Sequence, residues 1–190
     1  MAVVTATQVA AFTDISTGAT AIDATGLIPI VQERINLITN NYFTTDMTLQ
    51  GYFTFASASN SITSGGNFAD EGFLANDEIY IYNSYRNDGY KTISSVSAES
   101  IILSTTDTVI AEPSGRSVYI AVVDWPSSLA YIAAQMVKYD YDDRPTQEAN
   151  VKSKSLGPYS VTYGQSGSTP FGYPEELIAG LAPFTIARLN

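Results

Sequence analysis

The side chains of this chain that could do chemistry are carboxylates, tyrosines and a small number of lysines and arginines. The 190 residues include no cysteine and no histidine. Thiol nucleophiles, zinc sites of the usual Cys/His type and Ser-His-Asp triads are therefore excluded. Histidine is also the commonest general base near neutral pH, so an active site would have to use carboxylates, tyrosine or lysine. This composition favours a protein without enzymatic activity.

One acidic cluster has residue types that bind calcium: Asp140, Asp142, Asp143 and Glu148. The cluster lacks the alternating Asp/Asn frame with a central glycine and a closing glutamate. Carboxylates at the end of a helix oppose its dipole, so we expect them to pair with Lys138 or Arg144. We therefore predict no metal and no cofactor.

Two further arrangements have residue types found in hydrolases. Ser153-Lys154-Ser155 contains the pair used by Ser-Lys hydrolases, but its alternation is typical of a polar strand. An acid-based hydrolase would need two carboxylates that converge in a pocket, one of them with a raised pKa. Such a hydrolase stays open as the third functional alternative.

The chain contains 13 tyrosines, whose apolar rings and polar hydroxyls suit carbohydrate or protein binding. Tyr159 and Tyr163 lie in a stretch poor in other large apolar residues and are the better interface candidates. Five others lie in strand-like stretches, where we expect core or cross-strand packing: Tyr52, Tyr80, Tyr82, Tyr90 and Tyr119.

The net charge of −10 is unevenly distributed along the chain. Through residue 85, Arg34 is the only basic residue, whereas eight acidic residues occur there. Binding to a phosphate backbone needs clustered lysines and arginines, so nucleic-acid recognition is disfavoured. No apolar run approaches the roughly 18 residues that a membrane span needs, so we expect no membrane partner.

Hydrophobic periodicity predicts helices in both the first and the last parts of the chain. Ile28, Val31, Ile35 and Ile38 recur at three- and four-residue steps, which predicts a helix over 28–39. A second apolar stripe begins after Trp125-Pro126 and ends near 140–143, and a short final helix opens at 174–176. The segment 151–163 alternates as a strand or a hairpin would.

Between these helices the hydrophobic period is two. Five or six short strands are expected between Tyr52 and Val123, with a tight-turn signal at Asn87-Asp88-Gly89. Their spacing is typical of a small antiparallel barrel or sandwich. The predicted fold class is α+β: a helical core in two parts, 1–44 and 124–190, interrupted by an inserted β-domain at 45–123.

Three features resemble the head–tail connector, or head-completion adaptor, family of tailed bacteriophages. The first is the element order, with Leu27-Ile28-Pro29 opening the second helix and Trp125-Pro126 opening the third. The second is the run VKSKSLGPYSVTY at 151–163, similar to the family's K-S-E-S-L-G-x-Y-S-V-x-Y stretch. The third is YPEELIAGLAPF at 173–184, similar to its closing helix. The simplest family members lack an insertion such as 45–123, so the resemblance leaves its role open.

The resemblance implies a small helical-bundle core and a non-enzymatic structural protein of the virion neck, assembled in the cytoplasm of the host bacterium. Such adaptors form a ring, commonly of twelve copies, between the portal protein and the downstream neck or tail-completion protein. Genomic DNA passes through the ring without specific binding.

By matching position, 150–164 would be an extended arm and 173–190 a docking tail. The residues implied to contact the portal or a neighbouring copy are Lys152, Lys154, Leu156, Tyr159, Val161, Tyr163, Tyr173, Leu177, Phe184 and Arg188.

A binding module is the alternative to an adaptor. In this hypothesis a phage tail or fibre component recognises a surface glycan through the tyrosines of the β-domain. It predicts a concave aromatic site and measurable sugar affinity, and the adaptor hypothesis predicts neither.

Overall fold

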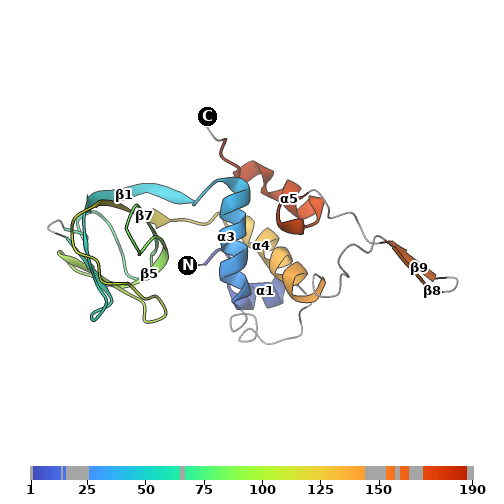
Figure 1. The fold of residues 1–190 in the computed structure, drawn as a ribbon, viewed down its shortest axis with the longest axis horizontal. Helices are drawn as coiled ribbons and strands as arrows, with labels where there is room; N and C mark the ends of the chain where they lie inside the picture. Colours follow the sequence, from blue (N-terminus) through green and yellow to red (C-terminus); the bar gives the residue numbers. More distant parts are fainter. Residues whose placement is uncertain are drawn as a thin grey trace. The chain divides into compact units, whose positions relative to one another are not determined.

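The computed structural model describes residues 2–13, 15, 26–64, 67–143, 153–156, 159–162 and 169–187. The chain divides into two compact units (Figure 1). One unit spans Tyr42–Trp125 and is built from strands; we call it the β unit. The other contains Ala2–Asn41 and Pro126–Asn190, and we call it the helical unit.

The helical unit is organised around one central helix. Its α-helices are α1 (Ala6–Phe12), α3 (Leu27–Thr39), α4 (Leu129–Lys138) and α5 (Glu175–Leu181). A π-helical turn η1 (Tyr139–Asp143) continues α4, and short 3-10 turns η3 (Pro170–Gly172) and η4 (Ala182–Phe184) flank α5. Helix α4 packs against α1, α3 and α5, and its buried face contains small residues that allow close approach, Ala130, Ala133 and Ala134.

Local signals in the sequence explain where these helices begin and end. Thr5 caps α1 through a capping box with Gln8. Helix α3 follows Gly26, whose φ of 66° is easily adopted by glycine, and ends at Asn40, which has a left-handed φ of 51°. The helix predicted over 28–39 is confirmed, because Ile28, Val31 and Ile35 form its buried face.

The β unit is a single antiparallel sheet of seven strands in the order β1-β7-β4-β5-β6-β3-β2. The strands are β1 (Thr44–Tyr52), β2 (Thr54–Ala56), β3 (Ser61–Thr63), β4 (Glu78–Tyr82), β5 (Gly89–Val96), β6 (Ser100–Leu103) and β7 (Ser117–Val123). Its core contains thirteen buried residues. Phe53, Phe55, Ile62, Ile79 and Ile120 are among them.

The predicted helical-bundle core is wrong, because the sheet is the main structure and the four α-helices of the described residues are short. Helices α1 and α5 have seven residues each, which is about two turns. Two turns are too few to form the long apolar seam that holds a helical bundle together.

The predicted barrel or sandwich is also wrong, because the sheet does not close. Strands β1 and β2 are separated in sequence by Phe53 alone, yet they lie at opposite edges of the sheet. Strand β2 has only three residues, and Phe55 within it already pairs on its outer side with Glu112 in an isolated bridge. The short β2 therefore closes no ladder with β1 in the described part of the chain.

Two more strands, β8 (Ser153–Leu156) and β9 (Tyr159–Thr162), form a separate antiparallel hairpin. The hairpin confirms the extended structure predicted for 151–163 as far as the described residues reach. None of the helices in the described ranges has the length and apolar character that a membrane span requires.

Candidate interaction surfaces

The hairpin β8–β9 contains four of the predicted interface residues. In its register Lys154 pairs with Val161 and Leu156 pairs with Tyr159. Directly paired residues share a face of a sheet, and so do residues two apart along a strand. These four positions therefore belong to one face of the hairpin. The other face is made by hydroxyl residues: Ser153, Ser155, Ser160 and Thr162.

The hairpin pairs only with itself among the described strands. Each of its strands consequently has an outer edge whose backbone N–H and C=O groups meet no strand of the seven-stranded sheet. An isolated two-stranded hairpin is marginally stable in water, and such edges accept a strand from another protein. Lys152 and Tyr163, also predicted to belong to this interface, lie outside the described residues.

Tyr173 lies inside the helical unit, although the sequence analysis placed it on an interface. Its side chain has no exposed surface. Its hydroxyl donates to Asp140 Oδ2 at 2.7 Å and accepts from Arg34 Nη1 at 2.8 Å. Arg34 also forms an ion pair with Asp140, whose side chain is only 3% exposed. Tyr173 is thus part of the internal structure of this unit.

The surroundings of this triad, which we call the Arg34 network, favour a charged arginine and a neutral tyrosine. Burial opposes the charge of Arg34, but the hydrogen bond to Tyr173 and the negative charge of Asp140 outweigh it, so the pKa of Arg34 is raised. Burial raises the pKa of Tyr173 to about 12, with a further contribution from Asp140. The guanidinium also lies over the rings of Phe171 and Tyr173, at 5.8 and 5.6 Å from their centroids.

The rest of the predicted docking tail also packs on its own unit as far as the structure describes it. Leu177 and Phe184 are half-buried. Asn41 Nδ2 donates to the carbonyl of Phe184 at 3.2 Å, and the N–H of Ile186 donates to Thr39 at 2.8 Å. Residues 184–186 are therefore held at the end of α3, and Arg188 lies outside the described residues.

The described residues contain no group of three carboxylate side chains placed to hold a metal ion. Asp140 pairs with Arg34 from the distant helix α3. The partners expected from the sequence were Lys138 and Arg144; Arg144 and Glu148 lie outside the described residues. Sequence reasoning missed Arg34 as a partner, although it is the only basic residue before residue 86.

Tyrosines cover the face of the β unit that points away from its core. Ile79 and Ile81 of β4 are buried, and the alternating Tyr80 and Tyr82 are at least partly exposed. Tyr82 stacks on Tyr119 of β7 with ring centroids 4.7 Å apart. Burial and the neighbouring Tyr119 raise the pKa of Tyr82. Cross-strand packing is therefore the correct interpretation for these tyrosines, and core packing is not.

This aromatic array continues across the sheet. Tyr42 stacks on Tyr80 with centroids 4.4 Å apart, and Tyr80 meets Tyr90 edge-on at 4.8 Å. Tyr90 in turn lies 5.5 Å from Trp125, at the end of the unit. Each of these rings therefore contacts at least one neighbouring ring.

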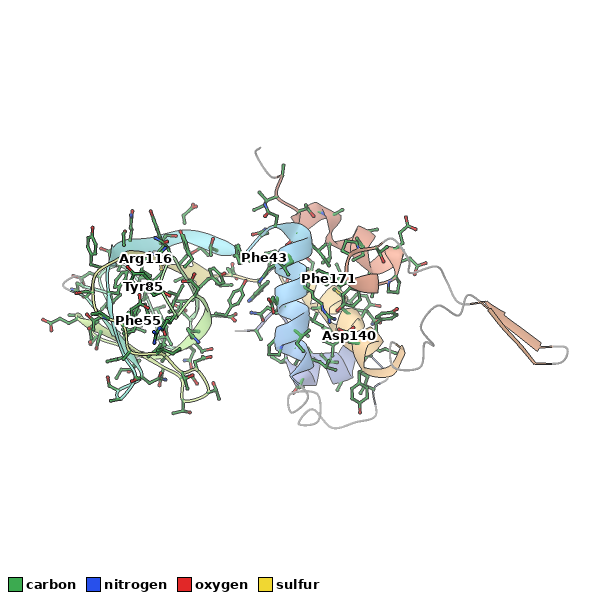
Figure 2. All side chains as sticks on the ribbon, viewed as in Figure 1. Phe43, Phe55, Tyr85, Arg116, Asp140 and Phe171 are labelled. Carbon is green, nitrogen blue, oxygen red and sulfur yellow. The ribbon has the colours of Figure 1, made fainter. Side chains whose placement is uncertain are left out.

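One further surface was missed by sequence reasoning, and it lies where β4 ends and β7 begins. Tyr85 is 65% exposed, and the guanidinium of Arg116 lies 4.9 Å from its ring centroid (Figure 2). Arg116 also donates to Asn83 Oδ1. Arg86 is exposed beside them. Tyrosine and arginine are the residues most enriched at the centres of protein interfaces.

No protein-family model matches the chain, and no curated protein matches it either. The function therefore has to be argued from the residues themselves.

Proposed function

We propose that the chain is a non-enzymatic structural protein of a tailed-phage virion, a head–tail adaptor. Copies of it form a ring between the portal protein and the neck or tail-completion protein, and DNA passes through the ring. The observation that supports this most directly is the hairpin β8–β9. The run that resembles the adaptor family forms a pair of strands with no other strand partner in the described chain.

The mechanism in this proposal is assembly by strand addition. The portal or a neighbouring copy supplies a strand to an edge of the hairpin and satisfies its backbone groups. The register pairs Leu156 with Tyr159 and Lys154 with Val161, so a partner that docks on the hairpin meets apolar residue types from both strands. The hairpin becomes ordered on contact, which limits stable assembly to the place where the partner is present.

The charge of the chain suits a conduit for DNA. A net charge of −10 repels the phosphate backbone, so DNA would slide past the subunits and not bind to them.

Glycan binding by the β unit is the second candidate, and the outward tyrosines favour it. Tyr42 and Tyr82 are 44% and 36% exposed. Sugars bind to free aromatic faces, so a glycan screen with Tyr82→Ala as the negative control tests this function. Binding that Tyr82→Ala abolishes would establish it in place of the adaptor.

Electron microscopy of DNA-filled, portal-bearing heads mixed with the purified protein tests the adaptor function. We expect a ring of added density beneath the portal. Ser155→Pro removes a backbone N–H from the centre of β8 and should prevent ring formation, whereas Ser155→Ala keeps that N–H and should not. Heads that bind neither the native protein nor Ser155→Ala would refute the proposal, and so would a ring formed equally well by Ser155→Pro.

A further inference from the structure

One end of the β unit presents exposed apolar side chains together with an exposed arginine, Arg86, and a half-buried one, Arg116. We call it the distal tip and define it as Tyr52, Tyr85, Arg86, Ile110 and Arg116. The register places it opposite the residues where the chain enters and leaves the unit, because Tyr52 pairs with Ser117 and Thr44 pairs with Val123. Tyr52, Tyr85 and Ile110 are 67%, 65% and 50% exposed.

Buried polar groups hold the two loops of the distal tip in place. Glu112 is 5% exposed and accepts from the N–H of Tyr85 and from Asn87 Nδ2, both at 3.0 Å. Asn87 is 3% exposed, and its amide also bonds both backbone groups of Ile110, at 2.7 and 3.0 Å. The exposed side chains therefore project from loops whose backbone is already ordered, which lowers the entropy cost of binding.

The loop at the opposite end of strand β4 carries acidic and apolar side chains, which complement the basic and apolar side chains of the distal tip. The loop 67–77, which precedes β4, contains the exposed residues Asp70, Glu71 and Leu74. Leu74 is 65% exposed. The loop that carries Tyr85 and Arg86 follows β4, so the five residues of this strand separate the two surfaces by about 16 Å.

The β unit is strongly acidic. Residues 42–125 contain ten acidic and only three basic residues, Arg86, Lys91 and Arg116. Two of these three lie at the distal tip. The two acidic residues of its loops, Asp88 and Glu112, accept hydrogen bonds from the backbone of the same loop, from Ser84 and Tyr85. The tip is therefore the least acidic end of this unit, and its exposed guanidinium group can meet a carboxylate of another surface.

We propose that the distal tip of one copy binds the loop 67–77 of the next copy. Leu74 packs against Tyr85 and Ile110, and the carboxylates of Asp70 and Glu71 meet the guanidinium groups of Arg86 and Arg116. Because the two surfaces differ, the contact is head-to-tail, and its repetition makes a ring when the rotation between neighbouring copies closes. This contact rests on the proposed ring and identifies the surfaces of the β unit that join its subunits.

The chain is suited to a cysteine test because it contains no natural cysteine. In the full chain, Leu74→Cys with Ile110→Cys places one thiol on each surface. The two sites lie at opposite ends of β4, too far apart for a disulfide within one copy. Leu74→Cys with Tyr131→Cys is the matched control, because Tyr131 on α4 is similarly exposed, at 56%.

Under mild oxidation we expect the 74/110 variant to form a ladder of disulfide-linked oligomers, far beyond the yield of the control pair. Adding Arg86→Glu should lower that yield roughly threefold or more, because it replaces an attraction by a repulsion. Lys91→Glu makes the same charge change away from the tip and should leave the yield unchanged. Adding Glu71→Lys to the 74/110 variant that carries Arg86→Glu should restore much of the yield of linked oligomers, because it restores a pair of opposite charges.

The measurement is made both on the free protein and on protein bound to heads. A 74/110 yield no higher than the control in both settings overturns the contact, and so does an equal effect of Arg86→Glu and Lys91→Glu. Linkage of residue 110 to a different virion protein also overturns it and assigns the tip to that protein. A ladder formed by free protein that does not bind heads leaves the contact standing and refutes only the adaptor function.

Discussion

The hydroxyl of Tyr173 donates to Asp140 Oδ2 at 2.7 Å and accepts from Arg34 Nη1 at 2.8 Å. Three segments far apart in sequence therefore meet at one buried oxygen: α3, the π-helical turn η1 after α4, and the segment before α5. Tyr139 adds a hydrogen bond from its hydroxyl to the carbonyl of Gly172 at 3.1 Å. The C-terminal segment of the helical unit is thus fastened by polar contacts as well as by apolar packing.

Tyr173→Phe should lower the stability of the helical unit by about 1–3 kcal/mol, because the buried carboxylate of Asp140 loses a donor. Chemical denaturation followed by far-UV circular dichroism measures the loss. Tyr131→Phe removes the same atom from an exposed ring on α4 and should change stability little. Equal effects of the two substitutions would show that the Tyr173 hydroxyl contributes nothing to stability.

The stability of the helical unit should also fall in strongly alkaline solution. The pKa of Tyr173 is raised from 10.0 to about 12, so the unfolded chain releases this proton at a lower pH than the folded one. The contribution of the neutral hydroxyl is complete below pH 10 and is lost as the pH rises toward 12. Denaturation midpoints measured across this range should fall more steeply for the native chain than for Tyr173→Phe, and parallel curves would contradict the assignment.

Arg34→Met should cost about 3 kcal/mol, because it removes a positive charge that is paired with the buried carboxylate of Asp140. Asp140→Leu added to Arg34→Met removes that isolated charge and should recover part of the loss. A double-mutant cycle on denaturation free energies measures the coupling. Strictly additive losses would show that Arg34 and Asp140 do not stabilise each other.

The periodicity of the sequence predicted individual helices and strands better than it predicted how they pack and pair with one another. Ile28, Val31 and Ile35 are sufficient to locate α3, because a helix repeats its apolar face every three to four residues. The same reasoning does not show that α1 and α5 are too short for a bundle. It also does not show that β1 and β2, separated by Phe53, lie at opposite edges of the sheet.

The Arg34 network was not predicted because its members are far apart in the chain. Arg34 and Asp140 are separated by 106 positions, and no local pattern links them. Nearby charges were the natural expectation for Asp140, and the packing of α4 against α3 adds a partner that is distant in the sequence. The distal tip was missed for the same reason. Glu112 bonds Tyr85 and Asn87, which lie in a loop far from it in the sequence, and both loops look simply polar in the sequence.

Asn87→Ala should destabilise the β unit by about 2–3 kcal/mol. The substitution leaves Glu112 without one donor and leaves both backbone groups of Ile110 unsatisfied beside a buried carboxylate. Gln50→Ala removes a similar amide from an exposed position with a single side-chain bond to Ser117, and should cost under about 0.5 kcal/mol. Denaturation followed by the fluorescence of Trp125, the only tryptophan, compares the two. Similar losses in both variants would show that the distal tip is not held by this network.

The β unit should fold when it is separated from the rest of the chain. Its two chain ends are held together, because the rings of Phe43 and Trp125 lie 4.7 Å apart and the N–H of Asp124 donates to Phe43 at 2.9 Å. Trp125 Nε1 also donates at 2.7 Å to Glu78, which is 6% exposed.

A segment of residues 42–125 should therefore give a cooperative denaturation transition with the tryptophan emission of the full chain. Trp125→Phe keeps a ring at this position but removes the donor to Glu78, and should cost the segment about 1–3 kcal/mol. Thr105→Ala at an exposed loop position is the control and should have almost no effect. A segment that shows no cooperative transition, while the full chain keeps one, would contradict this prediction. The contacts between the two chain ends would then be insufficient to stabilise the segment, and the sheet would need residues outside 42–125.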